Sequence, residues 1–264
     1  MLQMPHPRDD RATRRGKTII MDLGPDMYGW TGPRGLADLL DAAGNYIDAA
    51  KIWTFNAVTL PESYVKTVAA LYSDAGVHTF SGGLLFEYAF LKNEVPELIG
   101  HLKHMGIHGA EISENYLTLN DNERLAAISQ FAEAGIEVVF EYGAKHPTEP
   151  MDLEELAKVM ERVVGIGVHH VIFEQGEFDI LEEQRPEDAK ALMTDDAFAN
   201  LFIEVDNDRF PSQHTDLIKR FGPEINLANV GPAHIIRLES FRRGCGRQLD
   251  YPFMKDLVRA AGRD

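Results

Sequence analysis

The chain has 264 residues, of which 44% are hydrophobic and 26% charged, a globular balance that excludes disorder throughout. No apolar run approaches the ~18 residues that span a bilayer, and a formal net charge of −16 repels phosphate backbones, so neither a membrane nor a nucleic acid is an expected partner. Cys245 is the only cysteine and no apolar signal segment is present, so we expect no internal disulfide and a cytoplasmic protein.

The chain then divides into a short arm and one domain. Residues 1–17 are polar and contain several arginines and prolines, which predicts a flexible N-terminal arm. Residues 18–264 form the expected single domain. Eight short apolar runs begin, in chain order, at Thr18, Tyr46, Gly76, His108, Ile136, Val168, Asn200 and Ile225. By subtraction these starts lie 25 to 32 residues apart, which is the size of a β/α unit.

Amphipathic stretches between the apolar runs predict helices. They cover Leu36–Ala43, Glu62–Ala75, Val95–Met105, Asp121–Ala134 and Leu153–Val164. Buried strands that alternate with helices indicate a parallel sheet of the α/β class, and eight units in ~250 residues favour a closed (β/α)₈ TIM barrel. An open doubly wound sheet is the competing fold, but no GxGxxG or GxxxxGK[ST] follows a strand. The acidic stretch from Glu174 to Asp196 predicts an irregular loop.

Carboxylates stand where the predicted strands end, which is where barrel enzymes place their active sites. Three consecutive strands end in VVFE, VIFE and LFIE, at Glu141, Glu174 and Glu204, and the preceding strand carries Glu111. A buried carboxylate is costly unless it is paired or binds a cation, and Mg²⁺ prefers oxygen ligands. We therefore expect Glu111, Glu174 and Glu204 to bind Mg²⁺. The alternative is that these glutamates form ion pairs with Lys and Arg of neighbouring strands.

Two lysines accompany these carboxylates. Lys51 lies in the apolar strand DAAKIW, and Lys145 follows Glu141 in the loop EYGAK. A lysine among carboxylates can donate a proton or hold a substrate anion. We predict Lys51, Lys145 and Glu141 as the catalytic residues.

Other residues at the predicted strand ends are candidates for substrate binding. Asp22 ends the first strand, and Asn229 lies in the eighth. Gly82 and Gly83 allow a close backbone approach to an anion. Arg243 lies after the eighth strand, in the quarter of the barrel that often binds phosphate. We expect these five residues to contact a small-molecule acid.

Several longer segments resemble one enzyme family over most of the chain. They are NYIDAAKIW, SGGLLFEYAF, GAEISENYLTL, FEYGAKHP, INLANV and RLESFRRGCGRQLD. The chain resembles the phosphosulfolactate synthases, which add sulfite to phosphoenolpyruvate in the coenzyme M route. The resemblance implies a (β/α)₈ barrel, dependence on Mg²⁺, a Michael-type addition and a lysine proton donor.

The resemblance also assigns residues. The lysine of the family's Glu-x-Gly-x-Lys segment corresponds to Lys145, with Glu141 beside it. The family's lysine in the second strand corresponds to Lys51, and its glutamates in the sixth and seventh strands correspond to Glu174 and Glu204.

This chain departs from the family where phosphate binding is expected. The family's Gly-Arg-Glu-Ser-Gly after the sixth strand reads QGEFD here from Gln175, and its Glu-Ala-Pro-x-Lys after the seventh reads EVDND from Glu204. Added acids repel a phosphate dianion. One alternative is therefore a divergent member that acts on a non-phosphorylated carboxylate or carbonyl substrate through a Mg²⁺-stabilised enolate. Another is a non-catalytic role, like that of a heat-stress-associated plant relative. The sequence also leaves open whether the protein forms a homo-oligomer.

Overall fold

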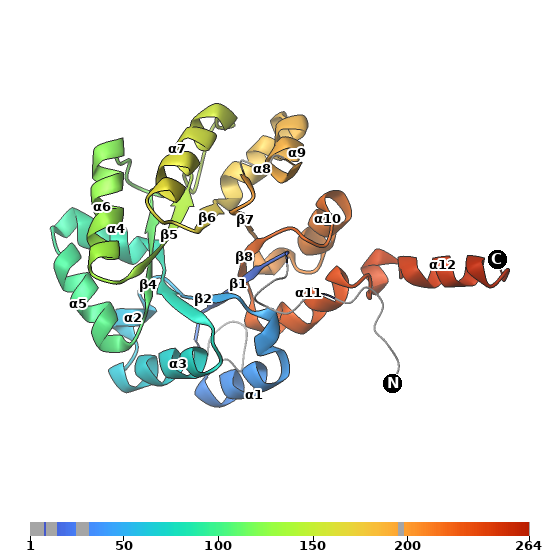
Figure 1. Cartoon of the computed structure of the whole chain (residues 1–264), viewed down its shortest axis with the longest axis horizontal. Helices are drawn as coiled ribbons and strands as arrows, with labels where there is room; N and C mark the ends of the chain where they lie inside the picture. Colours follow the sequence, from blue (N-terminus) through green and yellow to red (C-terminus); the bar gives the residue numbers. More distant parts are fainter. Residues whose placement is uncertain (1–7, 9–14, 25–31, 195–197, 264) are drawn as a thin grey trace.

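The computed structural model describes residues 8, 15–24, 32–194 and 198–263. Eight parallel strands close into a barrel in chain order, and the last strand pairs with the first. The strands are β1 (Thr18–Asp22), β2 (Ala49–Ile52), β3 (His78–Ser81), β4 (Gly109–Ser113), β5 (Glu137–Tyr142), β6 (His170–Phe173), β7 (Leu201–Glu204) and β8 (Leu227–Val230). The predicted (β/α)₈ barrel is confirmed, with the helices arranged around the strands (Figure 1).

Helices follow the strands in turn. The longer ones are α1 (Pro33–Ala43), α3 (Glu62–Asp74), α4 (Gly83–Lys92), α5 (Val95–Met105), α6 (Asp121–Glu133), α7 (Leu153–Gly165), α8 (Gln175–Gln184), α9 (Pro186–Thr194), α10 (Ser212–Phe221), α11 (Ile235–Arg242) and α12 (Pro252–Ala260). Short turns are α2 (Asn56–Thr59) and the 3₁₀ helices η1 (Gly44–Tyr46), η3 (Asn207–Arg209), η4 (Pro232–His234) and η5 (Arg247–Leu249). The five helices predicted from periodicity are therefore present.

The acidic stretch from Glu174 to Asp196 corrects one expectation, because it contains α8 and α9 instead of an irregular loop. Its apolar residues recur at helical spacing: Phe178 and Leu181 are buried in α8, and Ala189 and Leu192 are buried in α9. These pairs are each three positions apart and lie on one face of their helix. The acidic residues between these apolar positions make the helical spacing hard to recognise in the sequence.

The hydrophobic core has two parts. The larger part lies between the strands and the surrounding helices. The smaller part, the apolar barrel layer, is a separate cluster with one side chain from each strand except β4, and each member is at most 3% exposed. Its members are Ile19, Ala49, Phe80, Val139, Ile172, Phe202 and Ala228. This layer fills the inside of the barrel.

The two ends of the chain differ. Residues 1–7 and 9–14 of the predicted arm lie outside the described residues, while the Arg8 guanidinium pairs with Glu239 of α11 at 2.6 Å. Helix α12 has no buried residue and extends away from the barrel (Figure 1). No helix of the described part is both long and apolar enough to cross a membrane.

Candidate active site

A layer of charged side chains lies directly above the apolar barrel layer. Lys51, Glu141, Glu174 and Glu204 each follow a member of that layer by two positions along a strand or just past its end. Side chains two positions apart on a strand share a face, so all four extend into the barrel at its carboxyl end. Glu111 of β4 joins them through an ion pair with Lys51.

Lys51 is the buried centre of one half of this charged layer. Its Nζ lies 2.8 Å from Oε2 of Glu111 and 3.7 Å from Oε1 of Glu141. The side chains of Lys51, Glu111 and Glu141 are 6%, 1% and 2% exposed. Since β2 is not a neighbour of β4 or β5 in the barrel, these ion pairs cross its interior. These contacts bring Lys51 together with Glu111 and Glu141 in one site, as the strand-end positions predict.

Lys145 occupies the other half, at the rim. Its Nζ lies 2.5 Å from Oε2 of Glu174 and 3.5 Å from Oε1 of Glu204. The Lys145 side chain is 29% exposed, so it is the charged group of the layer that solvent reaches most easily. Gly143 lies between β5 and Lys145 and has φ +117°. A Cβ there would lie 3.0 Å from the Glu174 Cβ, so a glycine lets this loop pass close to Glu174.

The carboxylates outnumber the ammonium groups. Four glutamates and two lysines leave two negative charges uncompensated when all are ionised. Burial and the nearby Glu141 raise the pKa of Glu111 to about 8, and burial also raises the pKa of Glu174 and of Glu204. Burial therefore favours the protonated form of these three carboxylates, and a bound cation would oppose this.

Individual pKa shifts in the layer follow the ion pairs. Burial alone would raise the pKa of Glu141, but Lys51 and Lys145 outweigh it and lower the pKa to about 2. Burial alone would lower the pKa of each lysine, but the surrounding carboxylates outweigh it and raise both pKa values. Both lysines are thus protonated in the resting site, and Glu141 is ionised.

Three carboxylates fit a divalent cation. One oxygen each of Glu141, Glu174 and Glu204 lies within 4.8 Å of the others. Oε2 of Glu204 is buried and receives no hydrogen bond from the described residues. An all-oxygen set of this kind suits Mg²⁺. The predicted ligand set named Glu111 in place of Glu141, but Glu111 is turned toward Lys51 and the Gly83 N–H, which donates to its Oε1 at 2.8 Å.

The predicted substrate-binding residues do not all reach this site. Asn229 does lie at the carboxyl end of β8, is 4% exposed, and has a buried Oδ1 without a hydrogen-bond partner among the described residues. The Asp22 carboxylate is turned outward, where it accepts hydrogen bonds from the Tyr72 hydroxyl of α3 (2.7 Å) and the Gly24 N–H (2.8 Å). Asp22 is thus at the expected end of the barrel but outside the charged layer.

Arg243 lies at the opposite end of the barrel, contrary to its predicted place. It pairs with Glu239 at 2.8 Å, and its guanidinium lies 5.7 Å from the ring of Tyr46, which precedes β2. The reason is geometric, because α11 runs back from the carboxyl end of β8 and Arg243 follows its last turn. The structure thus pairs Arg243 within the protein at the amino end of the barrel.

Gly82 and Gly83 approach protein atoms closely. A Cβ at Gly82 would lie 2.7 Å from the Thr54 nitrogen, and one at Gly83 would lie 2.5 Å from the Ser113 Cβ. The Gly83 N–H does contact an anion, as expected for such a glycine, but the anion is the Glu111 carboxylate. These glycines therefore let α4 begin against β4 and orient Glu111.

Glu87 was missed in the sequence. It is 3% exposed and accepts hydrogen bonds from the Ser113 hydroxyl and from the N–H groups of Asn115 (2.9 Å) and Tyr116 (3.0 Å). This carboxylate fixes the loop after β4. A lone acid inside the apolar helix sequence GGLLFEYAF was the available signal.

Comparison with known proteins identifies relatives along nearly the whole chain. The model of the (2R)-phospho-3-sulfolactate synthase (ComA) family matches residues 6–247. A phosphosulfolactate synthase of Methanocaldococcus jannaschii is 28% identical over 240 residues, 88% of this chain and 92% of that protein. One of Methanothermobacter thermautotrophicus is 28% identical over 249 residues, 90% of this chain and 92% of that protein.

Among solved structures, the carboxyl transferase domain of Rhizobium etli pyruvate carboxylase with 3-bromopyruvate aligns with a TM-score of 0.57 and 11% identity. The alignment covers 91% of this chain and 46% of that one. At this identity the likeness concerns the fold alone.

Proposed function

Since the chain belongs to the (2R)-phospho-3-sulfolactate synthase family, which catalyses sulfite addition to phosphoenolpyruvate, we propose that its charged layer adds sulfite or a related nucleophile to an enolpyruvate-type acid. The observation that carries this proposal is the position of Lys145. Its ammonium is at the rim, in contact with Glu174 and Glu204 and accessible from solvent. A protonated amine at the rim can deliver a proton to a carbanion-like carbon, and the surrounding carboxylates keep it protonated until that carbon forms.

The proposed step forms one C–S bond and one C–H bond. The sulfur lone pair attacks the terminal methylene carbon of the enolpyruvate, and the π electrons of the C=C bond move toward the substrate carboxylate. Lys145 then donates its proton to the adjacent carbon and regains one from solvent. The substituent oxygen stays bonded to that carbon, so no leaving group departs.

Lys51 has a different part in this proposal. It lies deeper than Lys145, at 6% exposure, and both of its ion pairs are with protein carboxylates. We assign it to holding Glu111 and Glu141 in place, instead of the predicted direct contact with a substrate anion.

Mg²⁺ fits the proposal through Glu141, Glu174 and Glu204, whose oxygens lie close together. Its two positive charges would match the two uncompensated negative charges of the layer. When bound, such an ion stabilises negative charge that develops on substrate oxygens. The proton that completes the reaction still comes from Lys145.

A second candidate, action on an acid without phosphate, is favoured by the pairing of three cations near the carboxyl end of the barrel. Lys51, Lys145 and Arg209 lie at or just beyond the ends of β2, β5 and β7, and each pairs with a carboxylate; the Arg209 partner is Asp179, at 2.6 Å. Phosphate binding needs free donors. A substrate phosphate would have to compete with these carboxylates.

One assay tests both candidates. The full chain is incubated with MgCl₂, sulfite and either phosphoenolpyruvate or 2-methoxyacrylate, and loss of the unsaturated acid is followed against a reaction without protein. Lys145→Met should lower turnover by about 10²- to 10⁴-fold, the range typical of a general acid. Lys158→Met, which removes an exposed lysine of α7, is the matched control. Absence of turnover with both acids would contradict the proposed function.

A further inference from the structure

A cleft lies at the opposite end of the barrel from the charged layer. This amino-end cleft has a volume of about 430 Å³, within the range of sites that hold small organic molecules. It is lined by residues that precede β1 and β8, by residues at the starts of β6 and β7, and by the ends of α9 and α10. It therefore shares no residue with the proposed active site.

The wall of the amino-end cleft is fixed by Asn226. Its side-chain NH₂ donates to the carbonyls of Ala199 (3.3 Å) and Leu201 (3.2 Å), and its Oδ1 accepts from the Lys17 N–H at 3.0 Å. Three separate segments are thereby joined at one amide. The cleft is built before any ligand arrives, which lowers the ordering cost of binding.

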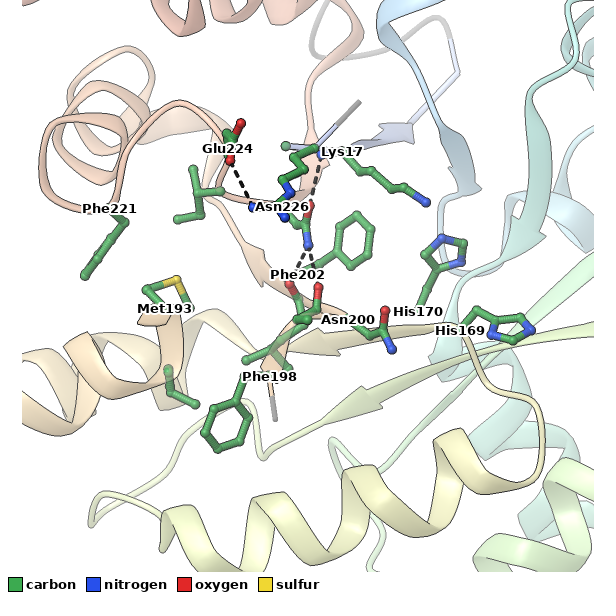
Figure 2. Close-up of a pocket in the computed structure, with 16 residues that line it drawn as sticks. Lys17, His169, His170, Met193, Phe198, Asn200, Phe202, Phe221, Glu224 and Asn226 are labelled. Carbon is green, nitrogen blue, oxygen red and sulfur yellow. Dashed lines mark hydrogen bonds and ion pairs between the residues drawn. The ribbon is translucent and has the colours of Figure 1, made fainter. Parts of the chain in front are cut away.

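The two sides of the amino-end cleft differ in chemistry. Figure 2 shows Lys17, His169 and His170 on one side and Met193, Phe198 and Phe221 on the other. The first side offers an ammonium and two imidazoles. The second offers a thioether and two aromatic rings. A ligand that satisfies both sides has an anionic head and an apolar body.

Lys17 is the cation best placed to hold the head. Among the described residues no carboxylate lies within ion-pair distance of its ammonium, whereas Arg15 pairs with Glu224 at 3.6 Å. His170 packs edge-on against Phe202 at 5.3 Å, and its Nδ1 lies 3.8 Å from Oε1 of Glu137, so its Nε2 is the nitrogen left for a ligand. Burial lowers the pKa of His170. One ammonium and hydrogen-bonding imidazoles match a single negative charge better than a dianion.

We propose that the amino-end cleft binds a small aromatic monocarboxylate, with the carboxylate at Lys17 and His170 and the ring against Met193 and Phe198. Its distance from the charged layer makes it a second site and not part of the reaction. The proposal is independent of the proposed function, since it uses none of the same residues.

Calorimetry with three probes tests the chemistry of this site. 2-Naphthoate carries both charge and ring, 2-naphthamide has the ring without the charge, and inorganic phosphate has charge without the ring. We expect only 2-naphthoate to bind the full chain. Lys17→Met should weaken that binding at least about tenfold, as loss of a charged hydrogen bond does, while Lys158→Met should leave it unchanged. Equal binding of the amide, or full affinity in Lys17→Met, would overturn the assignment.

Methionine methyl signals place the ligand. Met193 lines the amino-end cleft, whereas Met21 follows Ile19 of the apolar barrel layer by two positions and so lies toward the charged layer. With ¹³C-methyl methionine, 2-naphthoate should shift the Met193 signal, identified through Met193→Leu, and leave the Met21 signal in place. A shift of Met21 alone, or binding lost in Lys145→Met, would mean that the acid enters the carboxyl end and that the proposal is wrong.

Discussion

Replacing Lys51 by Met should destabilise the fold strongly, because it leaves two buried carboxylates without their cation. At 2.8 Å from Glu111, and with an effective dielectric constant of about 20, the pair interacts by ~6 kcal/mol before desolvation. Desolvation offsets part of this, and breaking a buried pair typically costs ~3–5 kcal/mol. For a chain of this length that corresponds to a fall in melting temperature of roughly 6–20 °C.

The assay is thermal unfolding in EDTA at several pH values. The destabilisation of Lys51→Met should shrink as the pH falls from 8 toward 5. Loss of the ammonium raises the pKa of Glu111 above the value of about 8 that it has beside Lys51, and it removes the main cation that lowers the pKa of Glu141. The folded variant therefore binds protons at higher pH than the folded unmodified chain does, and it regains stability as the pH falls. The double variant Lys51→Met/Glu111→Gln should recover part of the loss. A loss below ~1 kcal/mol, or no recovery in the double variant, would refute the reasoning.

Three further predictions concern single residues. Mg²⁺ at millimolar concentration should raise the melting temperature of the unmodified chain, and Glu204→Gln should reduce that rise; equal rises in both would argue against the proposed ligand set. Burial lowers the pKa of His214 to about 3, below its ordinary ~6.5, so the unfolded chain binds the proton first and ~2 kcal/mol of stability should be lost between pH 8 and pH 5; His214→Leu should remove this part of the pH dependence of the unfolding free energy. Gly83→Ala should cost ~1–3 kcal/mol in urea unfolding, because its Cβ would meet Ser113, whereas Gly100→Ala, with open space at the Cβ position, should cost nothing.

The barrel could be predicted from the sequence because its signal repeats eight times. Each apolar run became a strand, and the spacing left little choice of topology. The glutamates of the charged layer could be predicted too, since Glu141, Glu174 and Glu204 recur at the same place in successive units. Side chains alternate between the two faces of a strand, and each of these glutamates lies two positions beyond a buried apolar residue, so it faces the same way.

Side-chain directions away from that repeat could not be predicted. Asp22 stands one position out of register with Ile19 and Met21, so its carboxylate turns to Tyr72 outside the barrel. Arg243 is near the eighth strand in sequence, but α11 carries it to the other end. Glu111 was expected to bind metal because nothing in its own segment shows that Lys51 reaches it across the interior.

The apolar barrel layer has a consequence for how the two ends of the protein communicate. Its seven side chains are packed between the ion pairs at one end and the cleft at the other, each at most 3% exposed. Water and protons therefore reach the buried lysines and glutamates through the opening at the carboxyl end of the barrel. On the side of the apolar barrel layer, the electric field of the charged layer is only weakly screened. Hydrogen exchange at the charged layer should consequently depend on what occupies that opening, and sequence changes at the amino end can accumulate without altering the ion pairs of that layer.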